Sequence, residues 1–296
     1  MAGMSDYSAQ NVLNYITGNR LVPALPSVWI ALFTTAPTSD AGTGGTEVTG
    51  GSYARVQVAG PITAAGTIST GSTTITMPNV SGFPWVVPGM NVYDATAGKQ
   101  IGTVFTYIGN TLTLTANASN NGSGATDVLD FTAFAPATGS TGNPEPNTLP
   151  GSSVNTNATI TFPQATANWG TVTSFGLYDA STSGNLLAWD YIGNFRWIPF
   201  SASNASPSVL TADSAADAPT NGSSVVVTQK YGGTLPTTGG SWAGILTTAN
   251  LSGATFTVGV NSTSIGGGQF RQVTQQSIPQ NVTASFAAAA LTITLA

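Results

Sequence analysis

Few side chains in this chain can do chemistry, because its 296 residues include neither histidine nor cysteine. Ser-His-Asp triads, imidazole acid–base chemistry and metal sites built from histidine or thiolate are therefore excluded. Any hydrolysis must rest on carboxylates, and one pair of acids, Asp179 and Asp190, has aromatic neighbours on strands that should pair. Two carboxyl groups placed beside aromatic rings are typical of glycosidases.

The alternation of side chains along a strand argues against catalysis by this pair. Tyr178 should project to the opposite face from Asp179. Trp189 and Tyr191 should likewise project away from Asp190, so the rings cannot line a sugar beside the acids unless a bulge re-aims one of them. Ordinary structure is therefore favoured over a hydrolytic site, and non-catalytic sugar binding is kept as an alternative.

Metal and phosphate sites have little more support. Asp94, Asp127 and Asp130 could offer oxygen ligands to calcium, but their spacing does not match an EF-hand loop. The glycine-rich runs at residues 42–45 and 266–268 lack the lysine and the strand-to-helix context of a phosphate loop, and both are predicted to be loops. We therefore assign no catalytic, cofactor-binding or metal-ligating residues, and no cofactor.

Charge is scarce, and its distribution excludes several partners. The net charge is −5, and the six basic residues are scattered rather than clustered: Arg20, Arg55, Lys99, Arg196, Lys230 and Arg271. Binding to nucleic acid needs clustered lysine and arginine, so no nucleic-acid partner is expected. No apolar run approaches the ~20 residues of a membrane span, and residues 1–10 lack the pattern of a secretory signal.

The composition is that of a folded β protein. Hydrophobic residues make up 41% and aromatic residues 9%, which is enough for substantial cores, whereas charged residues make up only 6%. Disordered chains of low hydrophobicity are usually highly charged, and this one is not. Threonine, serine, asparagine and glycine take the place of charge, and these residues favour strand surfaces and turns. Without disulfides, stability must come from β pairing, burial and oligomerisation.

One helix is predicted, at residues 5–18. Ser5 or Asp6 can cap its first turn, and Gly18 can end it. Four apolar residues share one face at helical spacing: Ala9, Val12, Leu13 and Ile16. This stripe either covers one end of a β domain or docks on a neighbouring subunit.

The remaining pattern is that of strands and turns. Residues 28–33 form a short apolar run suited to a buried strand. Residues 102–108 and 111–115 flank a Gly-Asn pair and predict a hairpin. A second hairpin, residues 171–178 with 186–192, positions the two acids described above. Further elements are a proline-rich linker at residues 135–151 and an alternating closing strand at residues 291–295.

Segments along the chain resemble the tail-fibre or minor tail proteins of tailed bacteriophages. The resemblance rests on the N-terminal helix and on residues 28–37, 44–48, 51–55, 160–163, 167–172, 175–179, 184–187 and 286–295. These segments cover about half of the chain. The sequence departs from the compact form of the family by two insertions, which are similar to β modules of other phage fibre and decoration proteins. The resemblance implies no catalytic residue.

We expect an all-β fold with a central β-sandwich-like domain, a short N-terminal helix and two inserted small β modules. The central domain should combine residues 1–60, 151–195 and 273–296, with the inserted modules at residues 61–150 and 196–272. Glu47 and Arg55 could pair, but an exposed pair would be worth only ~0–1 kcal/mol.

The function expected from the resemblance is that of a non-catalytic structural component of a tailed-phage virion. A tail fibre or fibre-anchoring tail protein is the leading hypothesis, and the alternatives are a capsid decoration (head-fibre or cement) protein and a host-glycan-binding adhesin. The expected partners are copies of the chain itself, as a homotrimer, and other virion proteins of tail or capsid, with host-surface glycan as a further candidate. Such a protein is assembled in the host cytoplasm and resides in the virion.

Overall fold

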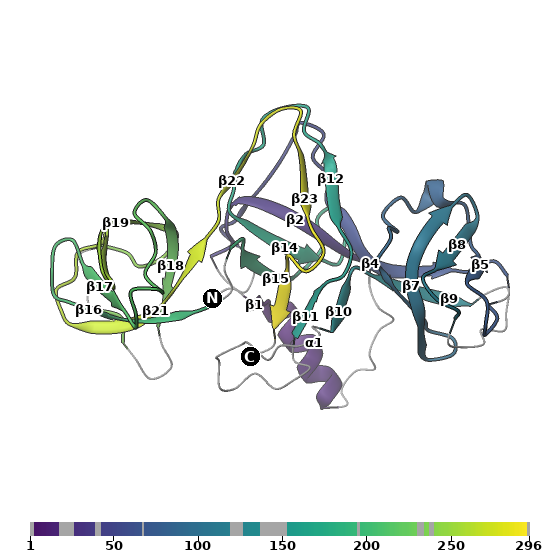
Figure 1. Cartoon of the computed structure of the whole chain (residues 1–296), viewed down its shortest axis with the longest axis horizontal. Coiled ribbons are helices and arrows are strands. Elements are labelled where there is room, and N and C mark those ends of the chain that lie inside the picture. Colours follow the sequence, from purple (N-terminus) through teal and green to yellow (C-terminus); the bar gives the residue numbers. More distant parts are fainter. Residues whose placement is uncertain are drawn as a thin grey trace.

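The chain folds mainly into β-structure in its computed structural model, which describes residues 3–17, 27–38, 43–66, 68–118, 127–136, 153–193, 196–229, 234–236 and 240–294. Strands account for 46% and helix for 6%, so the predicted all-β class with a short N-terminal helix is confirmed. Figure 1 shows three groups of strands in a row, with the helix at the lower edge of the middle group.

A long antiparallel sheet passes from the middle group of strands into the group formed by the predicted first insertion. The part in the middle group consists of β1 (Gly3–Met4), β15 (Leu186–Tyr191), β14 (Ser174–Tyr178), β2 (Val28–Thr35), β3 (Thr46–Glu47) and β4 (Val56–Thr63). The apolar run predicted at residues 28–33 lies within β2, where Ala31 is opposite Gly176 of β14. A Cβ atom on Gly176 would lie 2.9 Å from the Phe33 ring, so the packing here requires glycine.

The sheet continues through the predicted first insertion. Its strands there are β9 (Val128–Thr132), β6 (Asn91–Asp94), β7 (Lys99–Ile108), β8 (Thr111–Leu114) and β5 (Thr74–Thr76), with a short 3₁₀ helix, η1 (Val80–Gly82). β7 and β8 form the hairpin predicted around Gly109, whose φ of 59° suits the turn. Buried residues of this insertion and of the middle strands belong to one hydrophobic cluster, which includes Leu32 and Phe131.

Three smaller sheets complete the middle group. They pair β10 (Phe134–Pro136) with β11 (Ser153–Thr156) and β24 (Thr292–Thr294), β12 (Ile160–Gln164) with β23 (Thr283–Phe286), and β13 (Gly170–Val172) with β22 (Gln276–Ile278). The centre of the Phe286 ring lies 6.2 Å from that of Phe162 and 6.0 Å from that of Phe175. The β12–β23 pair therefore packs on β14 through aromatic rings. β24 confirms the predicted closing strand as far as residue 294. The predicted linker at residues 135–151 falls mostly outside the described residues, and its first two residues belong to β10.

The segment predicted to be the second insertion forms a closed barrel. Its strands, in order around the barrel, are β16 (Ile198–Ala202), β17 (Val209–Ala212), β20 (Thr255–Val258), β19 (Leu246–Ser252), β18 (Ser224–Thr228) and β21 (Gly266–Val273). The barrel has a hydrophobic core of its own, in which the Phe256 and Phe270 rings lie 5.1 Å apart. The run at residues 266–268 is therefore a strand and not the predicted loop. Glycine is needed there because a Cβ atom on Gly268 would lie 2.5 Å from the Thr228 carbonyl oxygen.

The helix, α1 (Asp6–Ile16), begins where the sequence predicts and turns its apolar stripe outward. The Ser8 N–H donates to Ser5 Oγ at 3.2 Å, which confirms Ser5 as the cap. Val12, Leu13 and Ile16 are 44%, 60% and 70% exposed, so the stripe does not cover the end of the β domain. Gly18, the predicted end of the helix, lies outside the described residues.

The predicted division into a central domain and two insertions stays a prediction, and the two junctions differ. β4 runs across residue 60, the predicted boundary of the first insertion. The hydrophobic core of that predicted insertion is continuous with the core of the middle strands. At the barrel junction, Gly193 forms a β-bridge with Val273. The Thr274 N–H also donates to the Ile192 carbonyl at 2.6 Å, so the chain enters and leaves the barrel at one place.

Deleting residues 196–272 and joining the ends with two glycine residues should leave a folded remainder. The joined ends already lie together, and the barrel core is separate from the other hydrophobic clusters. We expect the shortened chain to keep a β-type circular dichroism spectrum and a cooperative thermal transition. Loss of both would contradict the proposed boundaries of the barrel.

Candidate functional site

A cleft lies between the barrel and the edge of the middle sheet. The alternation of side chains in β21 creates one wall: Phe270 points into the barrel core, and Arg271 therefore points outward, towards β15. The cleft has a volume of about 460 Å³. It is lined by the end of β2 and the segment after it, by β15 and by the barrel: Thr34, Thr35, Ala36, Pro37, Thr38, Thr173, Trp189, Tyr191, Trp197, Val226, Val227, Thr228, Ala243, Gly244, Ile245 and Arg271.

Arg271 is the charged group of the cleft, and it is only 4% exposed. Its Nη1 donates to Asp190 Oδ2 at 2.9 Å, and its Nη2 donates to Asp190 Oδ1. The guanidinium carbon also lies 4.9 Å from the ring centre of Trp197 and 5.9 Å from that of Tyr191. Burial lowers the pKa of Arg271 to about 10, so the side chain still carries its charge at neutral pH.

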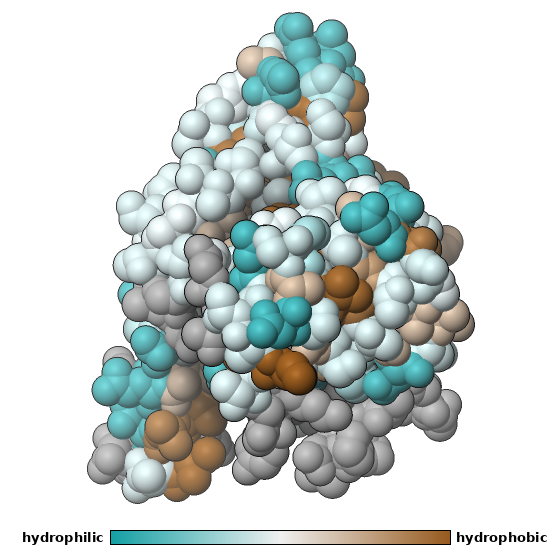
Figure 2. Space-filling view, turned by 90° about the vertical axis from the view of Figure 1, so that its left-hand side faces the viewer, coloured by the Kyte–Doolittle hydropathy of each residue, from teal (hydrophilic) through white to brown (hydrophobic). Residues whose placement is uncertain are grey.

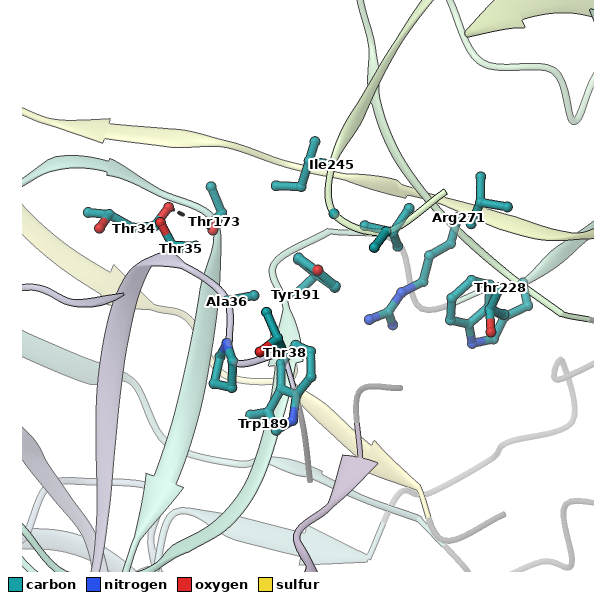
Figure 3. A pocket seen from close by; sticks show the side chains of 16 residues that line it. Thr34, Thr35, Ala36, Thr38, Thr173, Trp189, Tyr191, Thr228, Ile245 and Arg271 are labelled. Carbon is teal, nitrogen blue, oxygen red and sulfur yellow. Dashed lines mark hydrogen bonds between the residues drawn. The ribbon is translucent and has the colours of Figure 1, made fainter. Parts of the chain in front are cut away.

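Aromatic side chains form much of the wall of the cleft that faces Arg271. Figure 3 shows Arg271 reaching across the cleft towards Tyr191, with Trp189 and Thr38 beyond it. The Trp189 and Tyr191 rings meet edge to face, with their centres 5.5 Å apart. Trp189 is 4% exposed, and its Nε1–H has no hydrogen-bond acceptor among the described residues. Arg271 Nε is likewise buried and without a described acceptor.

The two acids that the sequence singled out are not brought together. Their strands do pair as predicted, and Asp190 lies opposite Phe175. Phe175 comes four residues before Asp179, so the two acids are separated by roughly 13 Å along the strand direction. Asp179 Oδ1 accepts from the Asn185 backbone N–H at 2.6 Å, and its Oδ2 accepts from the Asn185 amide at 2.8 Å. One acid therefore shapes the hairpin loop, and the other pairs with Arg271.

The calcium hypothesis finds no support in the geometry. Asp94 of β6 lies opposite Leu129 and is fully buried, whereas Asp130 lies opposite Tyr93, so the two acids face opposite sides of the sheet. Within the described residues, no group of three acids is placed to hold a metal ion. Of the run at residues 42–45, the described residues 43–45 lie outside any strand or helix, as predicted, and residue 42 is not described.

A second buried arginine, Arg55, organises the middle sheet near its hairpin loop. Its Nε and Nη2 donate to the two carboxylate oxygens of Glu47 at 2.8 and 2.7 Å. Its Nη1 donates to the carbonyls of Ala180 and Ser183 at 3.0 and 2.7 Å, and its guanidinium carbon lies 3.6 Å from the ring centre of Tyr178. The pairing of Glu47 with Arg55 is therefore confirmed, and because the Arg55 side chain is only 7% exposed, the low value for an exposed pair does not apply. Breaking this network would leave a buried charge without its partner.

Tyr53 completes the same network. Its hydroxyl donates to Glu47 Oε1 at 3.0 Å and accepts from the Leu32 N–H at 2.9 Å. Burial raises the pKa of the Tyr53 phenol well above its usual value, so the phenol keeps the proton that it donates. The Tyr53 ring also meets Trp169 edge to face at 5.3 Å. These contacts hold β2, β3 and the segment before β4 in register, which gives Tyr53, Glu47 and Arg55 a structural role.

Comparison with known protein families provides the deciding observation about identity. The family model described as Podophage GP4 fiber I protein gp80 matches residues 3–135 and 113–198, which together span more than half of the chain. The chain belongs to this phage fibre family. No curated protein matches the fibre protein, and no solved structure does.

The cleft lies where the part of the fibre protein that the family model matches comes to its end. The match ends at residue 198, the first residue of β16. The wall formed by β15 therefore lies within the matched part, whereas Arg271 and Val226 lie beyond it.

No helix in the described ranges has the length and apolar character of a membrane span.

Replacing Asp190 by asparagine should destabilise the fibre protein by about 3 kcal/mol, because it leaves the buried Arg271 cation without its partner. The second change Arg271→Met should recover most of that loss. The matched control is Asp217→Asn, which breaks an ion pair with Arg196, whose side chain is 46% exposed, and should cost less than ~1 kcal/mol. Urea unfolding followed by circular dichroism measures all three. A loss for Asp190→Asn no larger than the ~1 kcal/mol set for the exposed pair would show that the Arg271 pair is not important for stability.

Proposed function

We propose that this fibre-family chain is a non-catalytic structural component of a tailed-phage virion, a tail fibre or a tail protein that anchors one. The observation that carries the proposal is the family match, which covers the helix, the middle strands up to β15 and the first insertion. The placement of the acids supports it, because Asp179, Asp190 and Glu47 each hold neighbouring parts of the chain together. We further propose that the chain is assembled with other virion proteins in the host cytoplasm.

We also propose that copies of the chain assemble through exposed apolar surface, as a homotrimer. Figure 2 shows hydrophobic surface gathered at the lower edge of the molecule, the edge at which Figure 1 places α1. On the β surface of the first insertion, Phe105 and Ile108 of β7 are 59% and 73% exposed. Few charges interrupt these surfaces, since only 6% of the residues are charged, so little repulsion keeps copies apart.

Two alternatives stay open beside the tail-fibre proposal. A capsid decoration protein could use the same apolar surfaces, and the fibre family favours a tail location over this alternative. Binding to a host-surface glycan would be an additional role rather than a competing one. The aromatic cleft beside Arg271 is the observation that favours such a role.

Replacing Leu13 by aspartate should convert the oligomer to monomers, or weaken its association at least tenfold. Leu13 is 60% exposed at the centre of the apolar stripe, so a charge there would be buried on assembly without a partner. The control is Asn14→Asp, which adds the same charge at a partly exposed position outside the apolar stripe, about 100° from Leu13 around α1. Size-exclusion chromatography with light scattering at micromolar concentration should give a trimer for the wild type and for Asn14→Asp.

Two results would contradict this part of the proposal. A wild-type chain that stays monomeric at micromolar concentration would exclude a stable homotrimer. A trimer that survives Leu13→Asp unchanged would exclude α1 as the contact and leave the β surface of the first insertion. Circular dichroism of both variants should match the wild type, since neither residue is buried.

A further inference from the structure

A second hollow in the surface lies at the start of β4 and shares no lining residue with the cleft beside Arg271. β9 begins to pair with β4 only at Ala59, so within the described strands the first residues of β4 are paired on one side alone, by β2. A groove lies beside these residues, with the segment between η1 and β6 and the strand β12 as its other walls. We call it the tryptophan groove, and its lining includes Trp29, Gln57, Trp85, Thr159, Thr161 and Phe162.

Two of the six tryptophans line this groove, and their indole N–H groups are open to solvent. Trp29 and Trp85 are half-buried, and neither Nε1–H has an acceptor among the described residues. Neither nitrogen is enclosed by protein atoms, whereas Trp189 Nε1 is. The indoles of Trp169 and Trp242, by contrast, donate to backbone carbonyls at 2.9 and 3.0 Å. The groove therefore has two unpaired donors that water, and hence a ligand, can reach.

Both indole rings are held in place by the structure beneath them. Trp85 meets Phe131 edge to face, with the ring centres 6.2 Å apart. Trp29 belongs to β2, where it lies opposite Tyr178 of β14 on one side and Gln57 of β4 on the other. A site that is formed before binding loses little freedom when a ligand enters. The faces of such rings attract the slightly positive C–H groups of a saturated ring.

The polar groups of the lining can accept as well as donate. Gln57 Nε2 donates to the Ala59 carbonyl at 3.3 Å, which leaves Gln57 Oε1 as an acceptor. Thr159 and Thr161 are exposed, and their hydroxyls have no partner among the described residues. A ligand that both donates and accepts hydrogen bonds would use all of these groups.

The charge of the lining excludes an ionic ligand. Arg55 is the charged lining residue, and its Nε and Nη2 donate to the two carboxylate oxygens of Glu47 at 2.8 and 2.7 Å. The pair has no net charge, so the groove has no free charge with which to hold an anion or a cation.

The hydrogen-bonding groups exclude two further classes of ligand. A fully apolar molecule would remove the indole donors and Gln57 Oε1 from water without replacing their hydrogen bonds, which costs free energy. A proline-rich peptide would pack on the rings but has few N–H groups for Gln57 Oε1, because proline has none. Neutral saccharides have hydroxyls that donate and accept, together with apolar ring faces. The groove's volume of about 500 Å³ lies within the range of small-molecule sites.

We propose that the tryptophan groove binds a neutral saccharide. Its oxygens accept from Trp29 and Trp85 Nε1–H, one of its hydroxyls donates to Gln57 Oε1, and an apolar face of its ring lies against an indole. The whole lining falls between residues 29 and 163, within the part that the family model matches, so the site does not need the barrel. The inference rests on the glycan-binding role left open above and does not depend on trimer formation.

Titration of ¹⁵N-labelled full-length protein with neutral disaccharides tests the site, because each tryptophan gives one indole N–H resonance. The probes are maltose, lactose, cellobiose and chitobiose, and the variants Trp29→Phe, Trp85→Phe and Trp197→Phe assign the three key resonances. We expect at least one probe to shift the Trp29 and Trp85 resonances saturably. The resonance of Trp197, which lines the cleft beside Arg271, should stay in place.

The affinities of the variants test the proposed contacts. Trp85→Phe keeps a ring against Phe131 and should weaken that probe's binding about fivefold, as loss of one neutral hydrogen bond predicts. Gln57→Leu leaves both indoles in place, removes the acceptor oxygen and should weaken binding by a similar factor. Trp197→Phe is the matched control and should leave the Kd unchanged.

The remaining outcomes decide against the proposal or divide it from the proposed function. No probe binding with a Kd below about 10 mM would overturn the saccharide site and leave the trimer and virion proposals intact. Shifts at Trp197 alone would overturn the tryptophan groove and keep a glycan-binding role for the cleft beside Arg271. Shifts at Trp29 and Trp85 caused by a blocked peptide, N-acetyl-Pro-Pro-Pro amide, but by none of the sugars would assign the groove to a protein partner instead. Recovery of a bound sugar as shorter products would contradict the non-catalytic function rather than the site.

Discussion

The ion pair between Arg271 and Asp190 connects the two largest structural features of the molecule, the barrel and the middle sheet. The pair depends on strand alternation, because Phe270 fills the barrel core and the next side chain must point outward. A cation in that position needs a partner, since an unpaired buried charge costs several kcal/mol. Asp190 provides it from the edge of β15. The pair fixes how the barrel sits against the sheet, and the cleft is the space left beside it.

Because charged residues are scarce in this chain, its few buried arginines have an important structural role. The chain has six basic residues, and two of them, Arg55 and Arg271, are almost fully buried. Both make bidentate contacts with a carboxylate and lie near aromatic rings, a geometry that the planar guanidinium provides and lysine does not. Most of the surface is left to threonine, serine, asparagine and glycine. A surface of this kind repels other copies weakly, which is consistent with a protein that assembles.

Local sequence patterns predicted the elements well and the long-range contacts poorly. The Gly-Asn turn at residue 109, the apolar run of β2 and the pairing of β14 with β15 all follow from turn chemistry and short-range periodicity. The Arg271–Asp190 pair joins residues 81 positions apart, and no local pattern encodes such a partner. The glycines at 266–268 were predicted to be a loop because their need for close backbone packing appears only when β16 and β18 lie beside them. The helix periodicity located the apolar stripe of α1 but could not say which way the stripe faces.

Tail and capsid proteins can use the same β surfaces, so location on the particle tests the central claim most directly. Gold-labelled antibodies raised against the barrel, residues 196–273, would be bound to intact virions and viewed by electron microscopy. The account predicts label at the tail, at a few discrete positions set by the fibres. Label spread over the capsid surface would contradict a tail fibre or its anchor and assign the protein to decoration of the head.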